Sequence, residues 1–413
     1  MCNLVQFSDL PHNQQQRISQ LDHLHEPVTY KKAANSPHWV QALQTEITAL
    51  QANNAWCEVD LPHGKRAISS KWVFKVKLKA DGSLERYKVR LVIREKIPKE
   101  GIDYTDTFSP IVKMTTIRTI LALAAARKWT LYQLDVNNAF LHRDLHEEVY
   151  MKMSEDIPNP HNKVCKLQKS LYGLKQASRQ WHSKLADFLK NQGYTQSKND
   201  YSLFLKQTQQ YLTVVAVYVD DILLTGSNPE EIQALKLNLH VAFGIKDLGL
   251  LNYFLGFEIS HLPNGITLTQ RKFTRDLLKD SGYNDAKPTA TPLPINCKLL
   301  ADTRVLLTDP TTYRTYIGKL NFLSNTRPDI SFAVQTLSQF MQQPTSTHME
   351  ALEHLLRCIS GTSGQGILLQ GVDSLQLAAY SDSDWASCPI SRRSVTGYVV
   401  LLDKSPISWK SKK

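Results

Sequence analysis

The strongest constraint in this sequence is a pair of adjacent aspartates set between two apolar runs. Residues 211–219 are apolar and rich in β-branched side chains, Asp220 and Asp221 interrupt them, and residues 222–225 resume the apolar character. This pattern predicts a β-hairpin with two acids at its tip. Neighbouring carboxylates close to apolar surface repel each other, so they require a cation or a proton. An ordinary Asp-rich turn is the alternative explanation.

A third acid strengthens the metal interpretation. Residues 130–136 alternate as a strand, with Leu131, Gln133 and Asp135 on one face. Asp135 therefore ends a strand where a sheet can hold it beside Asp220. Three oxygen-rich ligands on a small sheet suit Mg²⁺, which keeps several waters and takes its other ligands from substrate phosphates. Two such ions about 4 Å apart form a clamp for in-line phosphoryl displacement.

A basic hairpin is predicted over residues 71–93, where the pattern has a period of two and Asp81 and Gly82 supply the turn. Apolar side chains occupy one face of both arms, and cations occupy the other. The cations are Lys71, Lys75, Lys77, Lys79, Arg86, Lys88 and Arg90. Like charges that face one another across a hairpin destabilise it, so the pattern favours a phosphate partner over the alternative, a solvated outer face.

Composition limits the class of protein. The chain has 413 residues, 42% of them hydrophobic, which is enough for two or three packed cores and excludes disorder as the main state. Lys and Arg outnumber Asp and Glu by 49 to 38, which agrees with a polyanionic partner. No apolar run reaches the roughly 20 residues that span a bilayer. Dispersed cysteines and a polar start predict an intracellular protein, cytoplasmic or nuclear and not secreted.

Helical patterns lie between the predicted strands. One helix is expected to begin at Ser36, as its cap, and Pro37, and others are expected over 116–128, 170–192 and 229–243. The buried face of the first helix is expected to comprise Trp39, Val40, Leu43, Ile47 and Leu50. Helices and strands mixed without regular alternation favour an α+β fold.

Several of these segments resemble the reverse transcriptases of the Ty1/copia class of retrotransposons. The tetrapeptide YVDD at 218–221 is similar to the signature of reverse transcriptases, and QLDV at 133–136 with NAFLH at 138–142 is similar to the first catalytic motif of this class. Further blocks, in family order, are KWVFK at 71–75, GIDY at 101–104, TFSP at 107–110, SLYGLKQA at 170–177, YFLG at 253–256, NTRPDI at 325–330 and WKSKK at 409–413. The resemblance covers the chain from about residue 26 onward.

The resemblance implies an active site with two metal ions. It assigns the metal ligands to Asp135, Asp220 and Asp221, with the backbone carbonyl of Val136 as a further oxygen. The implied cofactor is Mg²⁺, with Mn²⁺ as an alternative.

It also implies contacts to the substrates. Arg90, with Lys88, would contact the incoming triphosphate. Phe140 would pack under the sugar and exclude a 2′-hydroxyl, and Gln176, expected to open a helix, would contact nucleotide and template. Core packing is the alternative for Phe140, and a solvated helix turn is the alternative for Gln176. The grip on the primer end is assigned to Phe254, Leu255 and Gly256.

The chain departs from the family pattern at three places. Residues 93–96 stand where the family has a small residue, a basic residue and glycine; Arg143 replaces a usual glycine; and Ser178 replaces a usual proline. None of these changes removes a metal ligand, but they are typical of a copy that drifts under weak constraint.

Residues 380–386 resemble the first strand of the copia-type ribonuclease H, with Asp382 as its first metal ligand. The helix that carries the next ligand in that enzyme would lie beyond Lys413, and neither Asp384 nor Asp403 takes its place. We therefore expect a truncated ribonuclease H without activity, whose three-stranded sheet lacks its covering helix.

The expected architecture is a right-hand polymerase with fingers, palm and thumb, a helical connection and a truncated RNase H-like sheet. We expect a flexible tail or linker remnant over 1–35, fingers and palm over 36–260, thumb and connection over 261–362, and the RNase H-like fragment over 363–413.

The function expected from these segments is RNA-directed DNA synthesis by two-metal nucleotidyl transfer. The expected partners are an RNA or DNA template with its primer, deoxynucleoside triphosphates and other proteins of the element, but no membrane. One alternative is a catalytically silent relic that binds nucleic acid through the basic hairpin. A metal-dependent phosphohydrolase would explain the acids but not the hairpin or the block order.

Overall fold

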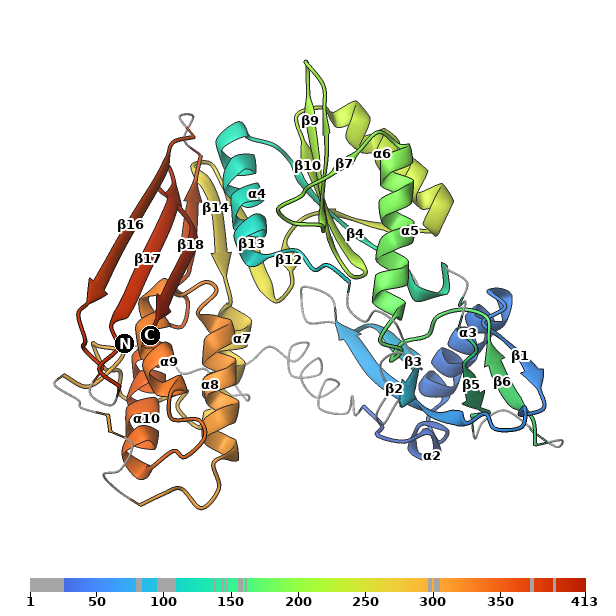
Figure 1. Cartoon of the computed structure of the whole chain (residues 1–413), viewed down its shortest axis with the longest axis horizontal. Coiled ribbons are helices and arrows are strands. Elements are labelled where there is room, and N and C mark those ends of the chain that lie inside the picture. Colours follow the sequence, from blue (N-terminus) through green and yellow to red (C-terminus); the bar gives the residue numbers. More distant parts are fainter. Residues whose placement is uncertain are drawn as a thin grey trace, which may run out of the picture. The chain divides into compact units, whose positions relative to one another are not determined.

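A computed structural model of the chain describes residues 26–78, 84–94, 109–136, 139–142, 145, 147–154, 159, 162–295, 299–300, 305–371, 375–388 and 391–413. Helices and sheets are mixed within them, as the sequence predicts (Figure 1). The chain forms two compact units: unit 1 comprises residues 1–110 and 137–192, and unit 2 comprises residues 111–136 and 193–413. The segment 36–260, expected as fingers and palm, is therefore divided between the two units. No described helix is long and apolar enough to cross a membrane.

Unit 1 contains a five-stranded sheet in the order β1-β6-β5-β2-β3. Its strands are β1 (Trp56–Val59), β2 (Ala67–Leu78), β3 (Leu84–Arg94), β5 (Tyr150–Lys152) and β6 (Val164–Leu167), and its helices are α2 (Tyr30–Ala33), α3 (Pro37–Ala52), the 3₁₀ helix η2 (Ala139–His142) and α5 (Ala177–Asn191). The one-turn helix α2 lies inside the segment expected to be a tail, and Ala33 in it is buried.

Helix α3 covers the β2–β3 hairpin with its aromatic face. The ring of Trp39 meets Phe74 edge-on at 5.5 Å and Tyr87 at 4.7 Å between centroids. One detail of the expected helix is wrong. Val40 is 45% exposed, because the packed face is narrower than the apolar pattern. Ser36 is the N-cap residue, as expected, although its side chain makes no capping bond.

Helix α5 begins at Ala177, seven residues later than expected. The preceding segment lies against β3, where the Ile93 amide donates to the Tyr172 carbonyl at 2.8 Å. Gly173 has φ +97°, and a Cβ at this position would lie 2.4 Å from the Ile93 carbonyl oxygen. The segment 170–176 is therefore not helical, because Tyr172 is bonded to a strand and the following glycine adopts a left-handed conformation.

Unit 2 contains a six-stranded sheet in the order β11-β4-β10-β9-β8-β7; Figure 1 labels β4, β7, β9 and β10 of this sheet. Its strands are β4 (Leu131–Asp135), β7 (Thr195–Gln196), β8 (Leu203–Gln207), β9 (Leu212–Tyr218), β10 (Asp221–Gly226) and β11 (Lys246–Leu250). Helices α4 (Met114–Arg127) and α6 (Pro229–Phe243) agree with the expected ranges. The Asn228 side chain caps α6 by accepting from the amides of Glu230 and Glu231, as the sequence indicates.

A second sheet of unit 2 has the order β12-β13-β14-β15. Its strands are β12 (Tyr253–Phe254), β13 (Phe257–Leu262), β14 (Gly265–Thr269) and β15 (Ile367–Gln370). The helices of this region are α7 (Arg271–Ser281), α8 (Thr311–Leu323), the 3₁₀ helix η3 (Pro328–Ile330), α9 (Ser331–Ser338) and α10 (Ser346–Ser360). Strand β15 pairs with β14, so this sheet includes strands from both sides of the boundary expected at residue 363.

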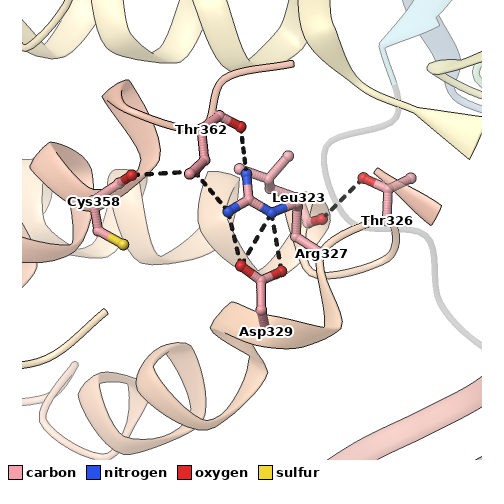
Figure 2. Close-up of polar contacts among 6 residues, drawn as sticks. All are labelled: Leu323, Thr326, Arg327, Asp329, Cys358 and Thr362. Atoms are coloured by element: carbon pink, nitrogen blue, oxygen red, sulfur yellow. Dashed lines mark hydrogen bonds and ion pairs between the residues drawn. The ribbon is translucent and has the colours of Figure 1, made fainter. Parts of the chain in front are cut away.

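Arg327 ties the turn after α8 to the end of α10, as Figure 2 shows. The side chain is 2% exposed, and its Nη2 lies 2.8 Å from Asp329 Oδ2. It also donates to the Thr362 carbonyl at 2.9 Å and to Thr362 Oγ1 at 2.8 Å, while Thr362 Oγ1 donates to the Cys358 carbonyl. This network gives a structural reason for the NTRPDI block.

The last three strands form their own antiparallel sheet, with β16 (Leu377–Asp384), β17 (Val395–Leu402) and β18 (Ser405–Lys412) side by side (Figure 1). Strand β16 is almost entirely exposed. Strand β18 is different, because Ile407 is only 6% exposed and belongs to the core that contains α4 and the six-stranded sheet. The Trp409 indole donates to the Ser324 carbonyl at 3.0 Å. This sheet therefore packs on the rest of unit 2 mainly through β18, with Val400 and Leu402 of β17 against the same core.

Candidate active site

The paired aspartates lie at the tip of the β9–β10 hairpin, as the sequence predicts. The turn consists of Val219 and Asp220, and the register pairs Tyr218 with Asp221. Both strands are deeply buried below the tip. Val219 has φ +54°, a left-handed conformation that is strongly disfavoured for a β-branched side chain and costs about 1–3 kcal/mol. The surrounding sheet thus holds the turn in a strained shape.

Strand β4 brings the third aspartate to the same end of the sheet. It pairs antiparallel with β10 and sets Asp135 directly opposite Asp221. Residues opposite one another in an antiparallel pair project to the same face, with Cβ atoms about 4.5–5.5 Å apart. The Val136 amide donates to the Asp220 carbonyl at 2.9 Å, which fixes the turn against the end of β4. The three aspartates therefore lie at neighbouring strand ends.

Two further side chains belong to this surface. Gln133 donates through Nε2 to Asp221 Oδ1 at 3.2 Å, so it orients that carboxylate. Lys246, the first residue of the edge strand β11, lies opposite Asp135 in the register of β4 and β11. The sequence motif includes Gln133 without assigning it a partner. It gives no signal for Lys246, because the pairing of β11 with β4 joins segments more than 100 residues apart.

The donor chemistry of this tip fits Mg²⁺. All three aspartates are half-buried, and carboxylates at adjacent strand ends supply the oxygen ligands that the ion prefers. Among the described residues, no three His, Cys, Asp or Glu side chains lie together so that they could hold a metal ion by themselves. Mg²⁺ usually takes only one or two carboxylates from protein and completes its shell with water and substrate phosphates. The residues present thus suit an ion whose shell the substrate completes.

The basic hairpin of unit 1 has the predicted charge arrangement. The register of β2 and β3 sets Lys75 opposite Lys88, and Lys77 opposite Arg86. The other face is buried through Trp72, Phe74, Val89, Leu91 and Ile93. Among the described side chains of the basic face, Lys71, Lys75 and Arg86 are exposed, whereas the side chain of Lys77, all of Lys79 and the expected turn lie outside the description. Part of the repulsion is offset within the chain, because Glu26 forms an ion pair with Lys75 at 2.6 Å.

The two cations assigned to the triphosphate lie beside an acid and an aromatic ring. Glu46 of α3 accepts from the Leu91 amide and is attracted by Arg90 and, less strongly, by Lys88. Burial nevertheless dominates and raises the pKa of Glu46 above its ordinary value. The guanidinium of Arg90 stacks on Tyr172, with Cζ 4.1 Å from the ring centroid.

The other predicted nucleotide contacts are largely buried in unit 1. Phe140 lies in η2 and is 8% exposed, with its ring centroid 4.5 Å from that of Tyr172. Gln176 is the residue before α5 and is 5% exposed. A solvated helix turn is therefore excluded for Gln176, whereas the contacts of Phe140 agree with core packing.

The expected primer grip forms the two-residue turn between β12 and β13. Leu255 has φ +52° and Gly256 has φ +87°, which match the turn type that joins tight hairpins. Phe254 is 1% exposed and packs in the core of unit 2, so its ring anchors the turn. A Cβ on Gly256 would lie 3.0 Å from Phe322 Cζ, which explains the glycine.

The remaining predicted metal ligand, Asp382, lies on the exposed strand β16 opposite Gly397. Asp403 serves another purpose, because its carboxylate accepts from the amides of Leu375 and Gln376 and closes a turn. Within the described chain, Asp382 belongs to no group of acids that could hold an ion.

Comparison with known proteins gives one matching family and several relatives. A family model described as reverse transcriptase (RNA-dependent DNA polymerase) matches residues 53–295. The retrovirus-related Pol polyprotein from transposon RE1 of Arabidopsis thaliana is 44% identical over 94% of this chain and 27% of its own length. The corresponding polyprotein from transposon TNT 1-94 of Nicotiana tabacum is 39% identical over 94% of this chain and 30% of its own length. A putative transposon Ty5-1 protein of Saccharomyces cerevisiae is 34% identical over 68% of this chain and 92% of its own length. The chain thus spans less than a third of the two plant polyproteins.

Proposed function

The chain belongs to the reverse transcriptase (RNA-dependent DNA polymerase) family, and from this premise we propose that it catalyses RNA-directed DNA synthesis by two-metal nucleotidyl transfer. Its relatives among plant and yeast transposons confirm the resemblance to copia-type Pol polyproteins. The observation that carries the proposal is the placement of three aspartates at neighbouring strand ends of one sheet, on a turn held in a strained shape.

In this proposal Asp135, Asp220 and Asp221, with the Val136 carbonyl, hold Mg²⁺, or Mn²⁺ as the alternative. The bound ions would activate the primer 3′-hydroxyl and neutralise charge on the leaving pyrophosphate. The chain contributes the geometry. Gln133 fixes the orientation of one carboxylate, and the bond from the Val136 amide holds the turn in place. Such preorganisation lowers the reorganisation that the reaction requires.

Arg90 and Lys88 would neutralise charge on the triphosphate. A stacked guanidinium is pre-organised for bidentate contact with phosphate oxygens, so the stack on Tyr172 supports this role for Arg90. Phe140 would exclude the 2′-hydroxyl by its volume, and Gln176 would contact nucleotide and template. These roles rest on the family resemblance and on the position of each residue in its motif.

The primer and template would bind through the basic face of the β2–β3 hairpin, assigned to Lys71, Lys75, Lys77, Lys79 and Arg86. Juxtaposed like charges on that face are stabilised when phosphates lie between them. The turn of Phe254, Leu255 and Gly256 would contact the primer end through its backbone and Leu255, since the Phe254 ring is buried.

We assign residues 36–260 to fingers and palm, residues 261–362 to thumb and connection, and residues 363–413 to an RNase H-like fragment. We propose that Asp382 is the first metal ligand of this fragment and that the fragment has no ribonuclease H activity of its own. The proposed partners are an RNA or DNA template with its primer, deoxynucleoside triphosphates and other proteins of the element.

Primer extension on a homopolymer RNA template with Mg²⁺ tests the proposal. Asp220→Asn should abolish extension and leave primer–template affinity nearly unchanged, because the phosphate contacts come from the hairpin. Asp247→Asn is the matched control, since Asp247 lies on the edge strand of the same sheet and pairs with Lys236. Extension by Asp220→Asn at the parent rate would refute the metal assignment. Tight primer–template binding without any extension by the parent would instead favour the silent, nucleic-acid-binding relic.

A further inference from the structure

Tyr172 contacts both side chains that the proposed function assigns to opposite ends of the incoming nucleotide. The Arg90 guanidinium lies over its ring, with Cζ 4.1 Å from the centroid. The Phe140 ring lies against it at 4.5 Å between centroids, with an angle of 59° between the planes. One half-buried aromatic ring therefore touches the proposed triphosphate contact and the proposed sugar-selecting residue.

The backbone that carries this ring is fixed. The Tyr172 carbonyl accepts from the Ile93 amide at 2.8 Å, and Tyr172 forms an isolated parallel bridge with Val92. The next residue, Gly173, approaches the Ile93 carbonyl so closely that no Cβ fits there. Tyr172 is thus fastened to β3, the strand that also carries Arg90. Side-chain substitutions at Tyr172 should consequently change the ring contacts without changing the course of the chain.

We propose that Tyr172 is a positioning residue that couples triphosphate contact to sugar selection, an inference that rests on the proposed function. Arginine carries about 2 kcal/mol of rotamer entropy, and stacking limits the orientations of its planar fork before the substrate arrives. The same ring supports Phe140 from one side, so Phe140 cannot retreat when a 2′-hydroxyl approaches. In a close-packed interior the loss of such support lets a neighbouring side chain move.

Two substitutions distinguish the role of the Tyr172 ring from that of its hydroxyl. Tyr172→Phe keeps both ring contacts and should leave the KM for deoxynucleotides and the ratio of GTP to dGTP incorporation near the parent values. Tyr172→Leu removes the π face and should raise the deoxynucleotide KM by about 3- to 30-fold, the range expected from one cation–π contact. It should also increase the GTP to dGTP ratio.

Tyr87→Leu is the matched control. Tyr87 lies on the same strand as Arg90, and its ring packs on Trp39 and His38. Its removal should lower thermal stability as Tyr172→Leu does, while the KM and the GTP to dGTP ratio stay unchanged. Equal KM and ratio for Tyr172→Leu and the parent would overturn the inference, and so would a Tyr87→Leu variant that reproduces both changes.

A binding measurement distinguishes failure of this inference from failure of the proposed function. The protein is first bound to a dideoxy-terminated primer annealed to a dC template, and dGTP with Mg²⁺ is then titrated in. Because this primer cannot be extended, the titration reports the affinity for the nucleotide alone. If the parent binds dGTP but extends no primer, the polymerase proposal fails, and weaker binding by Tyr172→Leu but not by Tyr172→Phe still supports the positioning role. If the parent binds no dGTP, both are refuted.

Discussion

Replacing Arg118 by methionine is expected to loosen the last three strands from the rest of unit 2. Arg118 lies on α4 and is 5% exposed. Its Nη1 donates to the Ile407 carbonyl at 3.2 Å, and its Nη2 donates to the carbonyl and the side-chain oxygen of Asn325 at 3.0 and 3.1 Å. The guanidinium also lies 3.9 Å from the ring centroid of Trp409. One side chain thus connects α4, the turn after α8 and strand β18.

The size of the effect follows from these contacts. Burial lowers the pKa of Arg118 to about 10, so the guanidinium stays charged at pH 7 and its hydrogen bonds are charge-assisted. Each buried acceptor left without its donor costs about 1–3 kcal/mol. A desolvated cation–π contact contributes about 2 kcal/mol. The net loss is smaller than the sum of these contributions, because a neutral methionine keeps the apolar stem packed and removes the cost of desolvating the cation. We therefore expect about 3–5 kcal/mol, as when a buried polar network is broken.

A double-mutant cycle with Trp409→Leu measures the coupling. Urea unfolding should give an interaction energy of about 1–2 kcal/mol between the two sites. Hydrogen exchange followed by mass spectrometry should show faster exchange in β18 for both single variants. Arg314→Met is the control, because Arg314 also donates to two backbone carbonyls but is exposed, and its loss should cost less than about 1 kcal/mol. Additive effects at 118 and 409, or unchanged exchange in β18, would refute the reasoning.

Three further outcomes are expected. Burial raises the pKa of Glu46. The protonated carboxyl therefore stabilises the fold below the ordinary pKa of glutamate, and this stability is lost as the pH rises and the carboxyl ionises. Glu46→Gln, which stays neutral, should raise the Tm at pH 7 but not at pH 4. Burial lowers the pKa of His348, and its Nδ1 accepts a hydrogen bond from the Thr345 amide. The stability of the protein should therefore fall as the pH drops below about 6.5. His348→Gln should remove this dependence when the Tm is compared at pH 7 and pH 5. Gly173→Ala should lower the Tm by several degrees, since its Cβ meets the Ile93 carbonyl, and an unchanged melting curve would contradict the close approach.

The sequence predicts the parts of this fold whose signals are local. The β9–β10 hairpin follows from a period of two interrupted by Asp220 and Asp221, and α6 follows from its Asn228 cap and Gly244 end. The alternation in β2 and β3 likewise predicts which face is apolar. In each case the apolar periodicity and the residues that form the turn or the cap lie within about 25 residues of one another in the sequence.

Interactions between distant segments were not predictable in the same way. In the sequence, Arg118 reads as one cation on a helix, because its acceptors lie 207 and 289 residues away. The apolar pattern also extends α5 backward to residue 170, although Gly173 and the bonds to β3 forbid a helix there. Without the long-range contacts of β18, the last three strands appear separable from the polymerase. With those contacts, deletion of 405–413 should destabilise unit 2.

The same reasoning explains how the acidic tip is tolerated before any substrate arrives. Adjacent carboxylates at a tight turn require compensation, which from sequence alone means a metal or a proton. The structure supplies two further groups: the amide of Gln133 donates to Asp221, and Lys246 lies opposite Asp135 on the neighbouring strand. An opposite charge at a directly paired position stabilises a sheet by about 0.2–1 kcal/mol. Because these groups offset part of the repulsion, we expect this sheet to stay folded without an ion. Replacing Asp220 by asparagine should accordingly remove activity while the sheet stays folded, and a variant that loses both would show that the metal site also holds the fold together.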